Sequence, residues 1–115
     1  MACVWSPRLL HSLWKPKEIY IIENGCAPSV VVSADGNVYG SSYVPPKRYD
    51  AATAATEEGI PLKGNFVWSA MDNFEWADGY ETLFGIVYVD FKTQKRIPKL
   101  SAQWFRQAAR RNALV

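Results

Sequence analysis

Two carboxylates in this sequence stand next to aromatic rings, in patterns that suit the handling of a sugar. Glu23 follows the apolar run 19–22, and Glu75 stands beside Trp76, a few residues after Trp68. Flat rings cover the apolar C–H face of a pyranose, and carboxylates accept hydrogen bonds from its hydroxyls. A carboxylate held at the anomeric carbon can also attack it and form a covalent intermediate. These residue types therefore indicate carbohydrate chemistry.

Each of these residues also has a simpler interpretation. Glu23 can be the end of a strand whose carboxylate turns to solvent, because a buried carboxylate is costly unless a partner pairs with it. Glu75 and Trp76 can belong to an ordinary surface loop with one buried ring. The residues by themselves leave both interpretations open.

The two acidic positions follow two predicted strands. The continuous apolar run 19–22 suits a strand that is buried on both faces, as in a parallel sheet, and residues 65–69 are predicted to form a second buried strand. The alanine-rich segment 51–58 between them favours a helix. A strand–helix–strand unit makes the two strands parallel. Their carboxyl ends, with Glu23 and the polar-aromatic loop 71–80, are therefore expected to open on the same side.

Shorter elements are predicted near the start of the chain. Residues 7–14 have helical apolar spacing after a Ser-Pro pair that suits a helix start. Residues 30–32 and 38–39 favour either a hairpin that turns at Asp35-Gly36 or a long surface loop.

Two elements are predicted near the end of the chain. Residues 84–90 predict a strand that pairs with 95–97 across a turn at 92–94. A final helix begins near Pro98. Its apolar face is expected to pack in the core and consists of Leu100, Trp104, Phe105 and Ala108.

The composition limits the class of protein. With 49% hydrophobic and 14% aromatic residues among 115, the chain is expected to fold. A net charge of +2 gives no support for nucleic acid or an anionic membrane as a partner. One histidine and two cysteines do not favour a metal site, and no cofactor is expected. No run reaches transmembrane length and no signal peptide is recognised, so we expect a cytoplasmic protein.

Five stretches of the sequence, in order, closely resemble the family 1 glycoside hydrolases, the β-glucosidase family. The resemblance covers residues 15–39 and 57–112, and the five stretches are 15–25, 66–76, 84–91, 93–99 and 101–105. It implies a retaining β-glycosidase that hydrolyses O-glycosyl bonds of β-glucosides on a (β/α)8 TIM barrel. This α/β chain would be the C-terminal part of an incomplete barrel: strands seven and eight and the final helix, as one partial domain over residues 1–115.

The resemblance also assigns roles to individual residues. Glu23 matches the family's catalytic nucleophile, and Trp68 matches the ring platform under the sugar. Glu75 and Trp76 match residues that bind the sugar's hydroxyls. Phe84 matches an aromatic residue that lines the same pocket.

The chain departs from the family in three respects. A TIM barrel typically needs about 250 residues, and the family's Asn-Glu-Pro motif, which carries the general acid/base, does not occur in these 115 residues. Ile22 stands where the family usually has Thr. Residues 40–56 do not resemble the family's amphipathic seventh helix; one hypothesis is a frame slip, which DNA sequencing would reveal as a shifted frame encoding such a helix.

These departures leave open whether the chain is an enzyme by itself, and we expect it to be weakly active or inactive alone. Two alternatives follow. The chain can be a non-catalytic module that binds a β-glucoside through Trp68, Glu75 and Trp76. It can also be a structural fragment that associates with a partner, or with itself through exposed strand edges.

Overall fold

The computed structural model describes residues 2–25, 30–34, 38–40 and 53–112. They form two compact units. The first unit comprises the described residues of Met1–Asn24 and Pro45–Val67, and the second unit comprises those of Gly25–Val44 and Trp68–Val115.

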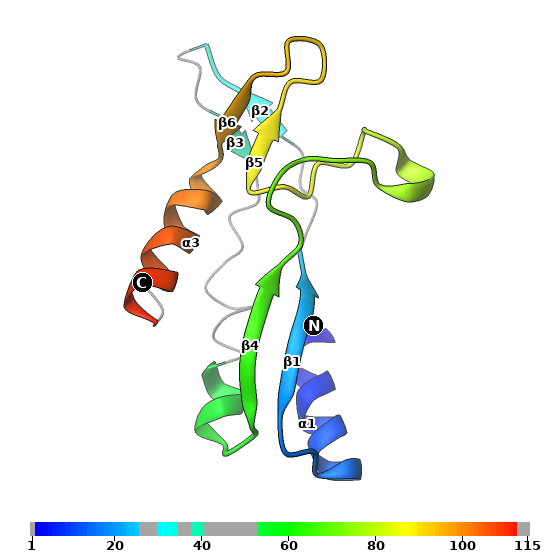
Figure 1. Ribbon diagram of the computed structural model, residues 1–115, viewed down its shortest axis with the longest axis vertical. Helices are drawn as coiled ribbons and strands as arrows, with labels where there is room; N and C mark the ends of the chain where they lie inside the picture. The colour runs from blue at the N-terminus through cyan, green and yellow to red at the C-terminus, as the bar shows by residue number, and fades with distance from the viewer. Residues whose placement is uncertain (1, 26–29, 35–37, 41–52, 113–115) are drawn as a thin grey trace. The chain divides into compact units, whose positions relative to one another are not determined.

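The first unit is built on two parallel strands, β1 (Ile19–Asn24) and β4 (Leu62–Val67), which lie side by side in Figure 1. Their register pairs Ile19 with Leu62 and Asn24 with Val67, so both carboxyl ends lie at the same edge. Parallel strands need a crossover connection, and its described part includes a helical turn at 53–57. The predicted parallel pair is thus confirmed, although β4 begins and ends earlier than the expected 65–69.

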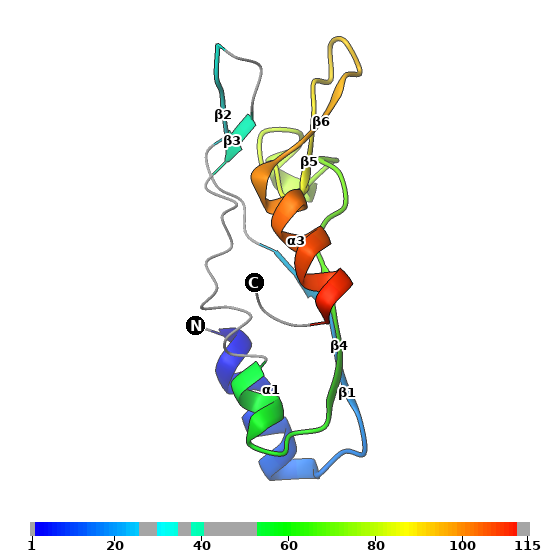
Figure 2. The same cartoon turned by 90° about the vertical axis from the view of Figure 1, so that its left-hand side faces the viewer.

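One face of this strand pair is covered by helical segments. Helix α1 (Ala2–Trp14) and the turn 53–57 lie on the same face, as Figure 2 shows. Arg8 Nε donates to Glu58 Oε2 at 2.7 Å, and a second bond joins the same two side chains, so an ion pair ties α1 to the end of that turn. This hydrogen bonding is the main cause that lowers the pKa of the Glu58 carboxyl. The predicted helix 7–14 is present but begins earlier, at Ala2.

The buried core of the first unit lies on this covered face. Ile19, Ala55 and Ile60 are buried there, and Leu62 packs against them. Ala55 has no exposed surface, which shows how a segment of small residues can still approach a sheet closely.

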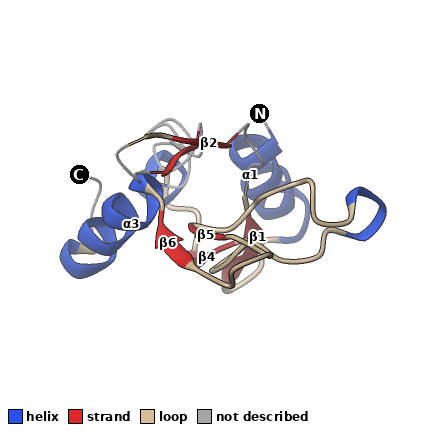
Figure 3. Cartoon of the chain, turned by 90° about the horizontal axis from the view of Figure 1, so that it is seen from above, coloured by secondary structure: helices blue, strands red, loops and turns tan. Residues whose placement is uncertain are grey.

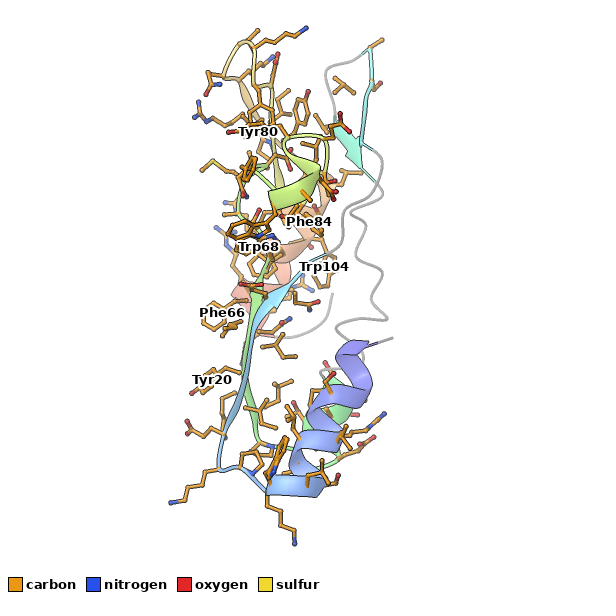
Figure 4. All side chains as sticks on the ribbon, turned by 90° about the vertical axis from the view of Figure 1, so that its right-hand side faces the viewer. Tyr20, Phe66, Trp68, Tyr80, Phe84 and Trp104 are labelled. Carbon is orange, nitrogen blue, oxygen red and sulfur yellow. The ribbon has the colours of Figure 1, made fainter. Side chains whose placement is uncertain are left out.

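The opposite face of the strand pair is open. Tyr20 and Phe66 point away from α1 in Figure 4 and are 51% and 58% exposed, and Ile22 is 72% exposed. The prediction that both strands are buried on both faces is therefore wrong for the described residues. The apolar run 19–22 places apolar side chains on both faces of the strand pair, because successive residues of a strand point to opposite faces. The helical segments of this unit cover only one of those faces.

The second unit contains two antiparallel hairpins and a helix. Strands β2 (Val30–Val32) and β3 (Val38–Gly40) form one hairpin, and β5 (Val87–Val89) and β6 (Arg96–Pro98) form the other. The pairing of β2 with β3 selects the hairpin over the alternative of a long surface loop. The predicted pairing of β5 with β6 is confirmed, although β5 is shorter than the expected strand 84–90. The predicted turn at Asp35-Gly36 and most of the divergent segment 40–56 lie outside the described residues.

Helix α3 (Leu100–Arg111) follows β6 directly, as Figure 3 shows, and contacts β3 and β6. It ends at Asn112, whose left-handed conformation lets its N–H bond to the Ala108 carbonyl. Trp104 and Phe105 are half-buried, whereas Leu100 is 50% exposed. The predicted helix is confirmed, and its expected apolar face is only partly covered by described residues.

The turn between β5 and β6 is organised by Asp90. Its Oδ1 accepts the backbone N–H of Lys92 at 3.0 Å, and its Oδ2 accepts the Thr93 hydroxyl at 2.7 Å. The Asp90 N–H and carbonyl bond to Lys95 and Gln94. The Thr93 hydroxyl is the largest of the causes that lower the pKa of Asp90, because these donors favour the ionised carboxylate.

We expect Asp90→Asn to destabilise this hairpin, and the effect to depend on pH. Because the folded-state pKa of Asp90 is lowered, its stabilisation is present above the unfolded-state pKa and is lost as the pH falls through the folded-state pKa. Urea unfolding at a series of acid and neutral pH values should show parent and variant converging in acid. A difference that stays constant with pH would contradict this, and Glu81→Gln, at an exposed position of the same unit, is the matched control.

Candidate functional site

Trp68 and Glu75 are held together by a direct contact in the second unit. The half-buried indole Nε1 of Trp68 donates to Glu75 Oε2 at 3.3 Å. This bond orients the indole ring and places a carboxylate at its edge. A flat ring with a hydrogen-bond acceptor beside it can receive both the C–H face and the hydroxyls of a sugar.

Trp76 and Phe84 lie close to this pair in sequence but differ in burial. Trp76 opens the short helix η1 (Trp76–Asp78) and is 79% exposed. Its φ of 43° lies in the left-handed region, which is uncommon for a bulky residue and is seen mainly at turns and functional sites. Phe84 is half-buried, and Figure 4 labels it together with Trp68.

Gly25 brings the chain close to the backbone of Trp68 and to the ring of Phe84. A Cβ atom at this position would overlap the carbonyl of Trp68 and would lie 3.3 Å from Cδ1 of Phe84. Only glycine leaves room for this approach. Gly25 is thus packed against the Trp68 carbonyl and the Phe84 ring.

Glu23 belongs to the first unit, where it is exposed near the carboxyl end of β1. Its neighbour Asn24 is 6% exposed, and Asn24 Nδ2 donates to Asn65 Oδ1 on β4 at 3.3 Å. This amide pair joins the two strands beside the Glu23 carboxylate. Sequence reasoning did not single out Asn65; an amide on each of two parallel strands near their ends was the available signal.

The five predicted site residues are therefore divided between the units. The structure brings Trp68 into contact with Glu75. Gly25 lies close both to the Trp68 carbonyl and to the Phe84 ring. The expected meeting of Glu23 with these residues stays a prediction.

The base of the loop that carries Glu75 is held by backbone hydrogen bonds. The Ser69 carbonyl accepts the Ile86 N–H at 2.9 Å, and the Ala70 carbonyl accepts the Val87 N–H at 3.1 Å. The Asp72 N–H in turn donates to the Val87 carbonyl at 3.0 Å. The peptide bond between Trp68 and Ser69 is cis. Residues 69–72 are thus fixed against 86–87, while the tip beyond them is largely exposed.

A buried ion pair lies at the end of this anchored segment. Asp72 Oδ1 accepts Lys99 Nζ at 2.9 Å and the Gly85 N–H at 2.8 Å, and Asp72 Oδ2 accepts the Val89 N–H at 3.2 Å. Lys99 Nζ also donates to the Leu83 carbonyl at 2.9 Å. The two side chains are 0% and 1% exposed. Sequence reasoning missed both residues, because Asp and Lys are mostly exposed and nothing local marks them as buried.

An open groove of about 970 Å³ within the second unit is lined by Trp68 and by three further rings, those of Phe74, Tyr80 and Phe91. Phe74 packs edge-to-face on Tyr80 with ring centroids 5.6 Å apart, and Tyr80 packs on Phe91 at 4.7 Å. Arg96 also lines the groove. The groove adds apolar surface beside the Trp68–Glu75 contact.

Within 2–25, 30–34, 38–40 and 53–112, no group of three or more His, Cys, Asp or Glu side chains could hold a metal ion. In the same part of the chain no helix has the length and apolar character needed to cross a membrane.

The sequence matches a known family and two close relatives. The family model described as Glycosyl hydrolase family 1 matches residues 7–114. Beta-glucosidase A of Thermotoga maritima is 46% identical over 112 residues, which are 96% of this chain and 25% of that protein. The 1,4-beta-D-glucan glucohydrolase of Thermotoga neapolitana is 45% identical over 113 residues, which are 96% and 26% of the two chains.

Solved structures give the same result. The Thermotoga maritima beta-glucosidase in complex with a substituted glucoimidazole superposes with a TM-score of 0.92 at 46% identity, and the match covers 98% of this chain and 26% of that one. A complex of the same enzyme with deoxynojirimycin matches equally. The chain thus spans about a quarter of the length of these relatives.

Proposed function

Because the chain belongs to glycosyl hydrolase family 1, we propose that it carries the nucleophile and the glucoside-binding residues of a retaining β-glucosidase. In this proposal, residues 1–115 are the C-terminal part of a (β/α)8 barrel. Strands β1 and β4 are its seventh and eighth strands, and α3 is its final helix. The parallel pairing of β1 with β4 supports this assignment, since neighbouring strands of such a barrel are parallel.

The contact between Trp68 and Glu75 is the observation that carries the proposal. The Trp68 ring lies under the sugar, and the Glu75 carboxylate accepts hydrogen bonds from its hydroxyls. Trp76 is exposed enough to bind a further hydroxyl through its indole N–H, and Phe84 lines the pocket. The names of two relatives, a beta-glucosidase and a 1,4-beta-D-glucan glucohydrolase, support glucose as the sugar.

Glu23 is the nucleophile in this proposal. Its carboxylate attacks the anomeric carbon, the bond to the aglycone oxygen breaks, and a covalent glycosyl-enzyme forms that water then hydrolyses. The aglycone needs a proton from a second carboxyl group about 5 Å away. The family motif that supplies this group does not occur in these 115 residues. The chain by itself is therefore weakly active or inactive on ordinary β-glucosides.

We expect Glu23 to be labelled by a fluorinated β-glucoside with a dinitrophenolate leaving group, because this leaving group departs without a proton. Mass spectrometry of the intact chain and of its peptides should find one glycosyl adduct on Glu23. An ordinary aryl β-glucoside should show at most trace hydrolysis.

The controls are Glu23→Gln, which should take no label, and Glu18→Gln, an exposed carboxylate at the start of the same strand, which should be labelled like the parent. A label on another residue would contradict the role of Glu23. Rapid hydrolysis of the aryl β-glucoside that Glu23→Gln abolishes would contradict the predicted low activity.

A non-catalytic sugar-binding function is the second candidate, and the exposed Trp76 beside the Trp68–Glu75 contact favours it. Calorimetry with deoxynojirimycin should then show weak binding, with a dissociation constant on the order of 1 mM. Glu75→Gln should weaken it, because the amide that replaces the carboxylate is a weaker acceptor. Glu81→Gln in the same unit should not. If Glu75→Gln and Glu81→Gln bind deoxynojirimycin equally well, Glu75 does not contact the sugar.

Self-association is supported by the open face of the first unit, where Tyr20, Ile22 and Phe66 are exposed. Apolar residues on an uncovered strand pair favour contact with another copy or with a complementing chain. Light scattering should therefore give a mass above 13.0 kDa. Ile22→Thr should lower this mass, whereas Lys63→Thr, an exposed change on β4, should leave it unchanged. A monomeric parent would contradict the proposal.

A further inference from the structure

We propose that Asp72 and Lys99 are positioning residues for sugar binding, because their buried ion pair fixes the loop that carries Trp68 and Glu75. The inference rests on the proposed sugar-binding role of those two residues. Asp72 lies between Trp68 and Glu75 in sequence. The side chains of Asp72 and Lys99 are both buried from solvent. Both therefore act through other side chains and not on the sugar itself.

The contacts of the pair reach both candidate sugar-binding segments. On one side, Asp72 ends the anchored segment 69–72 that follows Trp68. On the other side, Lys99 Nζ donates to the Leu83 carbonyl, directly before Phe84, and Asp72 Oδ1 accepts the Gly85 N–H, directly after it. One ion pair thus holds the segments on which Trp68, Glu75 and Phe84 are placed.

The fit around the pair leaves little freedom. A Cβ atom on Gly85 would overlap the backbone of Met71 and Asp72, so the two segments approach as closely as glycine allows. Asn73 Nδ2 donates to Ser69 Oγ and to the Met71 carbonyl, each at 2.9 Å. These bonds close the loop base on itself immediately beside the ion pair.

Stability alone explains the pair poorly. Removing two charges from water is costly, and well-packed apolar residues in the place of a buried ion pair are often as stable or more stable. A charged pair with several hydrogen bonds does, however, select one geometry, because any other arrangement leaves a buried charge without partners. Holding a binding site in one geometry is the use that matches the position of this pair next to the exposed loop tip.

The test compares three variants: Asp72→Asn, Lys99→Met and the double variant. The singles leave one buried partner incomplete, whereas the double removes both charges and should fold. The first measurement is the indole N–H resonance of Trp68, assigned with Trp68→Phe, because its shift and hydrogen exchange report the bond to Glu75 without any sugar. The second is fluorescence titration with deoxynojirimycin.

We expect a folded double variant in which the Trp68 indole resonance moves, its exchange accelerates and deoxynojirimycin binds about tenfold more weakly. The control is Glu58→Gln, which breaks the exposed ion pair of the first unit and should change neither measurement. Lys99→Arg keeps the positive charge, so its Trp68 resonance and its affinity for deoxynojirimycin should lie closer to those of the parent than the values of Lys99→Met do.

Two results would overturn the proposal. One is a folded double variant whose Trp68 resonance and affinity equal those of the parent. The other is a double variant that does not fold, since the pair would then serve stability. If the parent itself does not bind deoxynojirimycin, the proposed sugar-binding function fails, and the Trp68 resonance alone decides whether the ion pair positions the loop.

Discussion

The buried ion pair between Asp72 and Lys99 is the interaction on which the second unit depends. Taking both charges out of water carries a large desolvation cost, which the structure offsets with hydrogen bonds to Gly85, Val89 and Leu83. Asp72 and Lys99 are 27 residues apart, and their partners lie between them in sequence, so satisfying the two charges brings a loop, a hairpin and the start of α3 together. The exposed aromatic residues of the loop are therefore carried by residues 69–72, which these contacts hold in place.

The first unit is governed by a different constraint, the two faces of a parallel strand pair. Helix α1 and the turn 53–57 cover one face and bury Ile19, Ala55 and Ile60. The other face keeps its apolar side chains in contact with solvent. Parallel strands are usually covered on both faces, and the relatives that match this chain are about four times as long.

The candidate residues of the two units differ in their surroundings. Trp68 and Glu75 are fixed by a direct hydrogen bond above an anchored loop base, whereas Glu23 stands exposed beside the buried Asn24. In the proposed function the orienting groups must be rigid and the reacting carboxylate must be accessible, and each candidate residue meets the requirement of its own role. The hydrogen bonds at the base of the loop hold the segment on which Trp68 and Glu75 stand.

The sequence by itself determined the local elements and the residue types of the site. Apolar runs, turn residues and helical spacing predicted the parallel pair, the second hairpin and the last helix, and left the first hairpin open against a long loop, because these signals act over a few residues. The sequence also drew attention to Trp68 and Glu75, since aromatic and acidic residues together suit a sugar. Only the tertiary structure decided which face of β1 and β4 is covered and which charges are buried. Asp72 and Lys99 are 27 residues apart, and no local pattern records that two such distant charges meet away from water.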